Sequence, residues 1–538
     1  MALLTASAAA VKLIGVFYKL PLVALVGIEG MAYFLAAYHI YTLLFMISTA
    51  GLPVAVSILV SRRLAQNDEN GAGGVLFAAL KLFSLIGTVF FIGMVLFSDI
   101  IAASIKIPEA ALSIRAIAPA LLFTALSSAV RGYFQGCGIM YPTAVSQIIE
   151  AAGKLGLGLL FSTVGIRLGA ELHTVAALAI AGISAGSLLS CIYLFYLMQR
   201  KIQRVRSKKR DTGRTLFEIL KIAAPITLGA AVISLTGVID TALVSSRLQD
   251  AGFSSAEANS MYSSYGNLAV PIFALIPSFI SPVAVTAAPL LADAVSRGDK
   301  EKEKSIFLCA VRLCALIAVP ACFGIAMLSE PILMLLYPSQ PDAVRLAASM
   351  LSALAPAIFF SCMITVTNSV LQAYGKERLP VVSMLFGVAV KTALEYFLLG
   401  RADVNILGAP ISTLLCDLSI VCINIFFVQK YSCGAKGLTG AVLRPMSASL
   451  LPTAAALITY ILMTGHGISD TVALFAAIAL DILLYAVFAA WNGSVNEEDL
   501  LFLPHGEKLI IIMKKIRLLR NDNEQGRKNN LTQSKRKI

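Results

Sequence analysis

Two lysines, Lys12 and Lys19, lie inside the long apolar stretch from Ala2 to Val26. About 20 apolar residues are enough to cross a bilayer as a helix, and a lysine near the centre of such a helix costs roughly 2.5–3.5 kcal/mol on insertion scales. The two lysines are seven residues apart, which is close to two helical turns, so their ammonium groups lie on nearly one face. Such a face is tolerated where it meets protein or a water-filled cavity. We predict that this helix lines a cationic cavity for an anionic substrate.

Two further pairs of charged residues lie inside apolar segments. Glu150 precedes Lys154 by four residues, and Lys391 precedes Glu395 by the same spacing. Residues four apart on a helix are neighbours, so each pair can close on its own helix. Two interpretations remain open for the lysines: an internal pair that holds helices together, or a ligand for the substrate.

Asp240 has no partner nearby in the sequence and sits within the apolar stretch GVIDTALV. An ionisable residue inside a membrane helix is a functional candidate by default. Three interpretations stand: a coupling-ion or proton site, a hydrogen-bond acceptor between two lobes, or a carboxylate near the outer water. His39, also inside an apolar stretch, is more typical of a packed neutral histidine.

The sequence contains none of the motifs that mark soluble enzyme sites. There is no Walker A loop, no GxSxG and no HExxH, and the four His are dispersed. The nine Cys form no CxxC and no Cys/His cluster, and most of them read as small core hydrophobes. We therefore expect no enzyme activity, no cofactor and no metal site.

Composition places these residues in a membrane. Of the 538 residues, 58% are hydrophobic and only 14% are charged, whereas a soluble domain is about 25% charged. Long apolar runs favour helices over a β-barrel. No basic stretch precedes the first span and no small-residue cleavage site closes it, so we expect that span to be retained. The formal charge of +13 is interpreted as basic cytoplasmic loops and not as a sign of nucleic-acid binding.

The sequence predicts an all-α polytopic protein with about fourteen transmembrane helices. The expected spans are 4–26, 34–61, 74–98, 111–134, 142–165, 172–197, 216–245, 264–292, 305–328, 346–373, 380–399, 405–429, 440–463 and 469–491. Alternate loops carry 20 Lys and Arg on one side and 6 on the other. By the positive-inside rule the basic side is cytoplasmic, and both termini lie there. Whether the basic stretch after Gln199 and the basic tail bind anionic lipid headgroups or are merely solvated loops is open.

The chain also repeats itself. Ala-Pro-Ala at 118–120 recurs at 355–357, and Lys154 recurs as Lys391, both 237 residues later. The repeat contains an even number of spans, so both copies have one orientation, which predicts two pseudo-symmetric six-helix lobes with a substrate path between them. The expected organisation is a first lobe at 1–198, a basic cytoplasmic linker at 199–215, a second lobe at 216–431, two additional helices at 432–492 and a basic cytoplasmic tail at 493–538.

At this point a family resemblance can be stated. The run VKLIGVFYKLPLVALVG, the following AYHIYTLLFMISTAGLPVAVSILVSRRLA and the segment 265–299 resemble the stage V sporulation protein B and polysaccharide-biosynthesis transporter group. That group belongs to the multidrug/oligosaccharidyl-lipid/polysaccharide exporter superfamily. The resemblance covers about 480 residues and implies a flippase that alternates access between two lobes. Its relatives move undecaprenyl-linked cell-wall or polysaccharide precursors across the bacterial plasma membrane.

The resemblance also bears on individual residues. In the related lipid II flippases, basic residues of the first helix line the cavity, and Lys12 matches the first of them by position. Lys19 is one residue from the second, where Tyr18 falls. Those flippases carry an arginine early in the eighth helix, but this chain has no cation there and reads Tyr-Gly-Asn-Leu around Asn267. The departure favours the sporulation branch or another polyprenyl-linked glycan over lipid II.

Three hypotheses follow. The first is a flippase for a polyprenyl-diphosphate-linked glycan, in which Lys12, Lys19, Lys154 and Lys391 bind the substrate. The coupling or interlobe polar residues would then be Asp240, Glu150, Glu395 and Asn267, with Na+ or H+ as the coupling ion. The second is an ion-coupled multidrug exporter, which would need acidic cavity residues, with Asp240 first. The third is a non-transporting membrane scaffold for wall synthesis.

Overall fold

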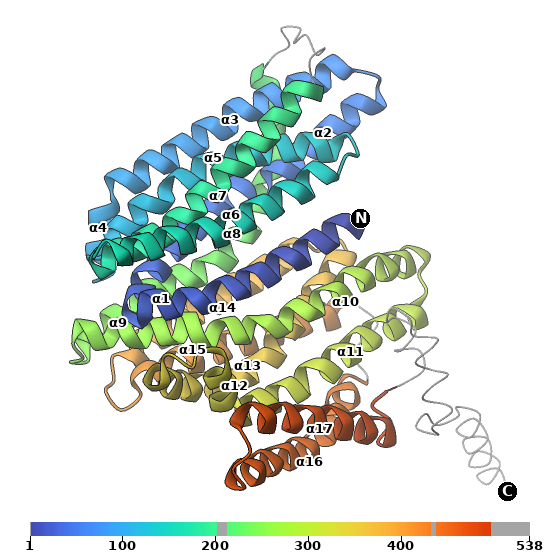
Figure 1. Ribbon diagram of the computed structural model, residues 1–538. Helices are drawn as coiled ribbons and strands as arrows, with labels where there is room; N and C mark the ends of the chain where they lie inside the picture. Colours follow the sequence, from blue (N-terminus) through green and yellow to red (C-terminus); the bar gives the residue numbers. More distant parts are fainter. Residues whose placement is uncertain (1, 202–211, 432–436, 496–538) are drawn as a thin grey trace, which may run out of the picture. The chain divides into compact units, whose positions relative to one another are not determined.

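The computed structural model describes residues 2–201, 212–431 and 437–495, and within these residues it contains helices and no strand (Figure 1). The α-helices are α1 (Ala2–Thr49), α2 (Leu52–Ala65), α3 (Glu69–Leu96), α4 (Ser98–Ser104), α5 (Ala110–Gly136), α6 (Tyr141–Arg167), α7 (Leu172–Lys201), α8 (Thr212–Asp250), α9 (Ser255–Ser263), α10 (Val270–Arg297), α11 (Lys300–Met327), α12 (Ser329–Leu336), α13 (Pro341–Ala373), α14 (Arg378–Leu399), α15 (Gly408–Tyr431), α16 (Leu438–Gly465) and α17 (Asp470–Trp491). A π-helix, η1 (Ser264–Ala269), precedes α10, and a short 3-10 helix, η2 (Asn405–Leu407), precedes α15.

Helix α1 folds back on itself at Gly27. This glycine has φ 72° and ψ 172°, a backbone conformation that favours residues without a Cβ. Tyr18 and Phe34 are 16 residues apart and would be separated by roughly 24 Å along a straight helix, yet their ring centroids are 6.2 Å apart. The two halves of α1 therefore lie side by side as separate helical segments.

The second expected span, 34–61, is interrupted in the structure. Helix α1 ends at Thr49, and α2 begins at Leu52, with Gly51 as its N-cap and a proline in its first turn. A Cβ on Gly51 would lie 2.7 Å from Thr227 Oγ1 and closer still to the carbonyl oxygen of Ala223. The close approach of α8 explains why glycine occupies this position. The continuous span that we expected at 34–61 is thus divided into two helices.

The count of spans agrees with the prediction of about fourteen. Thirteen helical segments of the described residues are long and apolar enough to cross a membrane, and one of them, Tyr18–Ala65, is 48 residues long. A helix of that length would be roughly 70 Å long, more than twice the thickness of the hydrocarbon core. Because the chain reverses at Gly27 and breaks at Gly51, the α1–α2 region accounts for the additional crossing. The all-helical polytopic fold is confirmed.

The chain divides into two compact units. Unit 1 comprises Met1–Pro271, Leu336–Ala347 and Lys391–Ser412, and unit 2 comprises Ile272–Leu335, Ala348–Val390 and Thr413–Ile538. The lobes predicted at 1–198 and 216–431, and the additional helices at 432–492, stay predictions. Most of the expected linker (199–215) and tail (493–538) lies outside the described residues.

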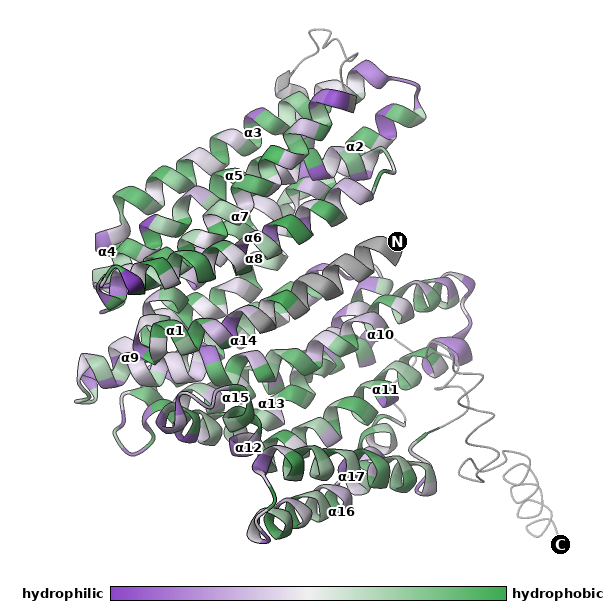
Figure 2. Cartoon of the chain, viewed as in Figure 1, coloured by the Kyte–Doolittle hydropathy of each residue, from purple (hydrophilic) through white to green (hydrophobic). Residues whose placement is uncertain are grey.

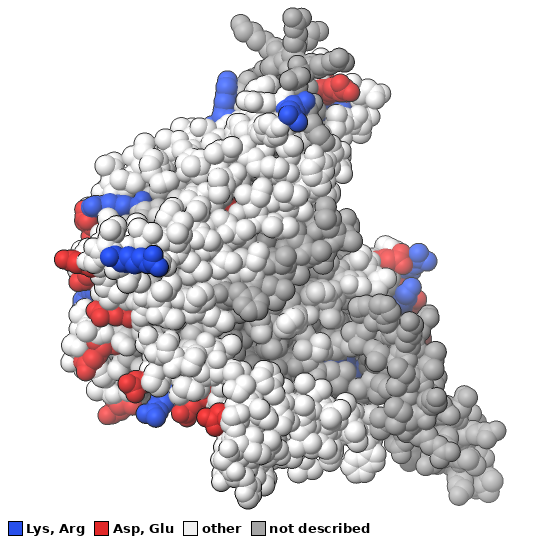
Figure 3. Space-filling view, viewed as in Figure 1, with Lys and Arg blue, Asp and Glu red and all other residues white. Residues whose placement is uncertain are grey.

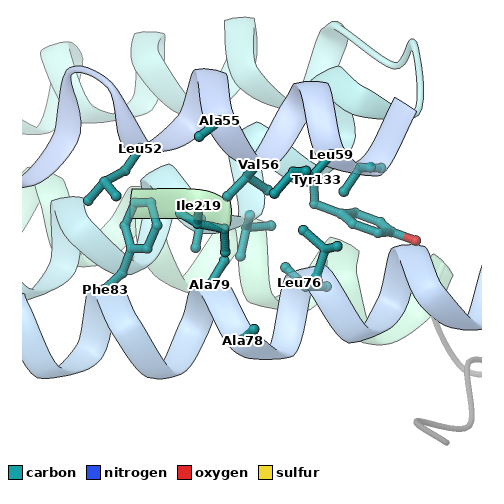
Figure 4. Close-up of a cluster of buried hydrophobic side chains, with 14 of the residues drawn as sticks. Leu52, Ala55, Val56, Leu59, Leu76, Ala78, Ala79, Phe83, Tyr133 and Ile219 are labelled. Carbon is teal, nitrogen blue, oxygen red and sulfur yellow. The ribbon is translucent and has the colours of Figure 1, made fainter. Parts of the chain in front are cut away.

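Unit 1 has a tightly packed apolar core between α2, α3, α5 and α8 (Figure 4). Val56 of α2, Ala79 of α3 and Ile219 of α8 are completely buried there, and Phe83 closes one end of the cluster. Small residues let the helices approach closely in a setting where lipid supplies no hydrophobic drive. This core fixes the helices that surround the polar residues described below.

Unit 2 is held by packing and by a buried polar cluster. Helix α16 packs against α17 and α11. The amide of Asn424 donates to Thr367 Oγ1 at 3.0 Å and to Asn368 Oδ1 at 2.8 Å, and Ser383 Oγ donates to Asn424 Oδ1 at 2.6 Å. These uncharged groups tie α13, α14 and α15 together within the unit.

The distribution of polarity fits a membrane setting. Apolar residues run along the helices, and polar residues concentrate towards their ends (Figure 2). On the face in view, the charged side chains lie at helix ends, with an extensive uncharged surface between them (Figure 3). Charged residues far from helix ends are therefore candidates for function.

Candidate functional site

Lys154 lies on α6 with its ammonium group between two tyrosine rings of α1. Its Nζ is 5.0 Å from the centroid of Tyr18 and 4.9 Å from that of Tyr38. An ammonium group over the face of an aromatic ring is attracted by the negative charge of that face, by about 0.5–2 kcal/mol for each ring. No carboxylate of the described residues lies within 4.0 Å of this ammonium group, so its positive charge is not neutralised by an ion pair.

The fold-back of α1 builds this setting. Tyr18 comes from the first half of the helix and Tyr38 from the second, and Phe34 lies between them, with ring centroids 6.2 Å from each. The hydroxyl of Tyr18 donates to the carbonyl oxygen of Ala179 at 3.1 Å, which fixes the ring against α7. Neither tyrosine could be assigned to this site from the sequence, because their pairing depends on the turn at Gly27.

Lys19 lies in the same part of unit 1, and its side chain is half-buried. Its ammonium group is close enough to that of Lys154 for the two charges to repel each other. Two cations close together and partly removed from water favour binding of an anion. The backbone of Lys12 lies in α1, but its side chain is outside the part of the chain that the structure describes, so its role stays a prediction.

Glu150 forms its ion pair with Arg131 and not with Lys154. Arg131 Nη2 lies 2.8 Å from Glu150 Oε2 and 2.9 Å from Ser190 Oγ, and its Nε donates to Ser146 Oγ at 2.9 Å. Of the two interpretations left open for Lys154, the internal pair with Glu150 does not form in the structure. The guanidinium of Arg131 presents several donors in one plane and captures the carboxylate across helices. Because of this capture, Glu150 does not serve as an ion-pair partner of Lys154.

Lys391 has the opposite surroundings. Its Nζ is 2.6 Å from Asp240 Oδ1 of α8 and 3.5 Å from Glu395 Oε1, one turn along α14. All three side chains are buried, with 4%, 9% and 0% exposure for Lys391, Asp240 and Glu395. Ser412 of α15 donates to Glu395 Oε1 at 3.2 Å. The predicted closure of Lys391 on Glu395 occurs, and Asp240 completes a triad that the sequence did not indicate.

A chain of polar groups leads away from Asp240. The next residue, Thr241, places its hydroxyl 2.9 Å from His39 Nδ1 and 2.7 Å from the hydroxyl of Tyr262. The Tyr262 hydroxyl is also 3.3 Å from the same histidine nitrogen. His39 is thus a hydrogen-bonded histidine within the helices, beside the triad.

Asn267 is placed in the π-helix η1 and is completely buried. Its Nδ2 donates to the carbonyl oxygen of Met31 at 3.0 Å and to Ser263 Oγ at 3.1 Å. It therefore connects η1 to the second half of α1. Single π-helical turns are frequent at functional positions, but these contacts by themselves describe a structural connection.

The described residues bring no metal-binding group together: no set of three or more His, Cys, Asp or Glu is positioned to hold a metal ion. The four substrate residues predicted from the sequence divide into three cases. Lys154 and Lys19 lie together, Lys391 is enclosed by carboxylates, and the side chain of Lys12 is not described. The predicted roles of these residues remain proposals.

Comparison with known proteins identifies the family to which the chain belongs. The model of the family described as polysaccharide biosynthesis protein matches residues 1–295, more than half of the chain. The chain belongs to this family. A second family model, described as MatE, matches residues 225–397. The resemblance that we noted in the opening residues is thereby confirmed.

Two relatives from Bacillus subtilis (strain 168) match most of the chain. The lipid II flippase MurJ is 25% identical over 441 residues, which cover 78% of this chain and 80% of that protein. Stage V sporulation protein B is 26% identical over 420 residues, with coverages of 76% and 79%. Among solved structures, the lipid II flippase MurJ in an inward closed conformation superposes with a TM-score of 0.68 and 16% identity, covering 91% of this chain and 98% of the other. At that identity the superposition shows a shared fold.

Proposed function

We propose that this protein is an alternating-access flippase that moves a polyprenyl-diphosphate-linked glycan across the bacterial plasma membrane, with both termini in the cytoplasm. The observation that carries the proposal is the ammonium group of Lys154, which lies inside the helical unit without a carboxylate partner among the described residues. The family and the functions of its relatives support the same interpretation.

The chemistry of a diphosphate suits this site. A diphosphate carries negative charge on several oxygens and accepts charge-assisted hydrogen bonds from ammonium groups. Each such contact contributes about 1.5–3 kcal/mol, so contacts from Lys154 and Lys19 would hold the headgroup while leaving it releasable. The half-buried position of both lysines lowers the competition from water and salt.

The match to the MatE family model raises the alternative function of an ion-coupled multidrug exporter. A cationic drug would need an available carboxylate, and Asp240 was the leading candidate. In this structure Asp240 lies 2.6 Å from the ammonium group of Lys391, so a cationic drug would have to displace a cation that is tethered to the chain. This pairing favours the flippase over the drug exporter.

The proposal is tested by measuring flipping of a fluorescent undecaprenyl-diphosphate glycan in proteoliposomes. The variants are Lys154→Ala, Lys12→Ala and Lys154→Arg, and the matched control is Lys81→Ala, which removes an exposed lysine from α3. A fluorescent glycolipid without the diphosphate serves as the control substrate. We expect Lys154→Ala to slow flipping of the diphosphate lipid about tenfold or more, as the loss of one charge-assisted contact implies, and Lys154→Arg to retain most of it.

Two results would contradict the proposal. Equal rates for the wild type, Lys154→Ala and Lys12→Ala in folded, correctly oriented protein would show that these cations do not bind the substrate. Absence of flipping by the wild type would favour drug export, and accumulation assays on Asp240→Asn would then be the next measurement.

A further inference from the structure

The triad of Asp240, Lys391 and Glu395 does not balance its charge. Two carboxylates and one ammonium group leave a net charge of −1 when all three are ionised. The side chains are 9%, 4% and 0% exposed, and they lie in α8 and α14, both of which are long and apolar enough to cross a membrane. A buried, uncompensated charge is strongly unfavourable, so the triad requires one further positive charge.

The hydrogen bonds indicate where that charge resides. Glu395 Oε1 accepts from Ser412 and lies 3.5 Å from Lys391 Nζ. Its other oxygen, Oε2, is buried and receives no hydrogen bond from a donor among the described residues. Both carboxyls contact the same ammonium group, since Lys391 Nζ lies 2.6 Å from Asp240 Oδ1 and 3.5 Å from Glu395 Oε1. An ionised carboxylate only accepts hydrogen bonds, so neither carboxylate can supply the donor that Glu395 Oε2 lacks.

We propose that Asp240 and Glu395 share one exchangeable proton, and that the ammonium group of Lys391 is a permanently bound cation that fills the place a metal ion would otherwise take. Paired carboxyls in close contact commonly hold a single proton between them. With that proton the triad is neutral, and without it the triad carries −1. The site therefore binds and releases a proton as the protein cycles, which rests on the transport function proposed above and identifies its coupling ion as H+.

Other titratable groups lie near the triad. His39 of α1, Tyr262 of α9 and Tyr265 of η1 interact electrostatically with members of the triad, and Lys19 of α1 interacts with His39. Thr241, the residue after Asp240, places its hydroxyl 2.9 Å from His39 Nδ1. The hydroxyls of Thr241 and Tyr262 are 2.7 Å apart, so His39, Thr241 and Tyr262 form a hydrogen-bonded cluster beside Asp240.

The test is infrared difference spectroscopy of the full-length protein in lipid at neutral pH, which detects the C=O stretch of a protonated carboxyl. The informative variants are Glu395→Gln and Asp240→Asn. Either change leaves one carboxylate beside one ammonium group, a pair that is neutral without a proton. The matched control is Glu150→Gln, because Glu150 forms an ion pair with Arg131 at 2.8 Å and takes no part in the triad. The spectra are recorded with and without Na+.

We expect the wild type to show a protonated-carboxyl band that Glu395→Gln and Asp240→Asn both remove, that Glu150→Gln retains, and that Na+ does not change. A wild-type spectrum without such a band, or a band that survives both triad variants, would overturn the shared proton. Loss of the band on adding Na+ would show that a metal cation competes for the site and would overturn the role given to Lys391.

The spectrum does not depend on transport. The lipid-flipping measurement on Lys154→Ala and the infrared measurement on Glu395→Gln can therefore fail separately. A protein that flips lipid without the protonated band would retain the proposed function and lose this inference. A protein that shows the band and flips no lipid would retain this inference and lose the proposed function.

Discussion

Lys154 and Lys391 occupy the same position in the two copies of the repeat, 237 residues apart, and have opposite surroundings. Lys154 faces the rings of Tyr18 and Tyr38 and has no carboxylate within 4.0 Å among the described residues. Lys391 is enclosed by Asp240 and Glu395. Lysines at equivalent positions of the repeat therefore differ in their surroundings: one faces aromatic rings, and the other pairs with two carboxylates.

Two neighbouring positions account for the difference. With the same offset, Glu395 corresponds to Gly158 in the first copy, and Glu150 corresponds to Gly387 in the second. A Cβ on Gly158 would lie 2.9 Å from the hydroxyl of Tyr18, so an aromatic ring occupies the space that a carboxylate side chain would need. Each copy therefore has one carboxylate four residues from its lysine, on opposite sides along the chain.

An ion pair with a neighbouring helix determines whether the carboxylate pairs with the lysine on its own helix. In the first copy Arg131 takes Glu150 at 2.8 Å. The position of Arg131 corresponds to Asn368 in the second copy, where the uncharged amide of Asn424 makes the connection at 2.8 Å. The arginine thus frees Lys154 by removing its nearest carboxylate.

The largest expected effect comes from Lys391→Ala. Removing the ammonium group leaves two buried carboxyls without their cation, and breaking a buried pair in this way costs about 3–5 kcal/mol. We expect a clear fall in thermal unfolding temperature in detergent for Lys391→Ala and almost none for Lys154→Ala. Adding Glu395→Gln to Lys391→Ala should recover part of the loss. Equal falls in unfolding temperature for Lys391→Ala and Lys154→Ala would show that the two lysines do not differ in their buried ion pairs.

A smaller effect is expected from Arg131→Ala, which releases Glu150. The freed carboxylate lies one turn from Lys154 on α6 and would pair with it, so binding of a diphosphate lipid should weaken about threefold to tenfold. The double variant Arg131→Ala/Glu150→Gln should restore binding, because no carboxylate remains to compete. Measurement of lipid binding by fluorescence quenching checks both variants. If the double variant binds as weakly as the single one, Arg131 itself contacts the substrate.

The smallest effect is expected from Tyr38→Leu, which retains an apolar side chain and removes one aromatic face from Lys154. A single cation–π contact at a partly exposed site contributes about 0.5–1 kcal/mol, so we expect a loss of diphosphate-lipid binding of about twofold to fivefold. Tyr41→Leu is the matched control, because Tyr41 lies on the same helix. Among the described residues, the ammonium group of Lys154 faces the rings of Tyr18 and Tyr38 and not that of Tyr41. A larger loss for the control would assign the effect to helix packing.

Much of this protein could be predicted from sequence because membrane insertion depends on local properties. Long apolar runs specify helices, since backbone polar groups in lipid must be satisfied within the segment. The all-helical fold, the number of crossings and the family follow from patterns such as the stretch containing Lys12 and the repeated Ala-Pro-Ala. The spacing of Lys391 and Glu395 also predicted their contact, because residues four apart on a helix are neighbours.

The partners of the charged residues required the tertiary structure. Asp240 meets Lys391 from 151 residues away, and Arg131 meets Glu150 across two helices. The turn at Gly27 brings the rings of Tyr18 and Tyr38 to 5.0 Å and 4.9 Å from one ammonium group. Electrostatic energy depends on distance in space and on burial, and neither can be read from separation along the chain. The sequence alone determined that cations lie within the membrane helices, and the packing of α1, α6, α8 and α14 decided which of them remain available to bind an anion.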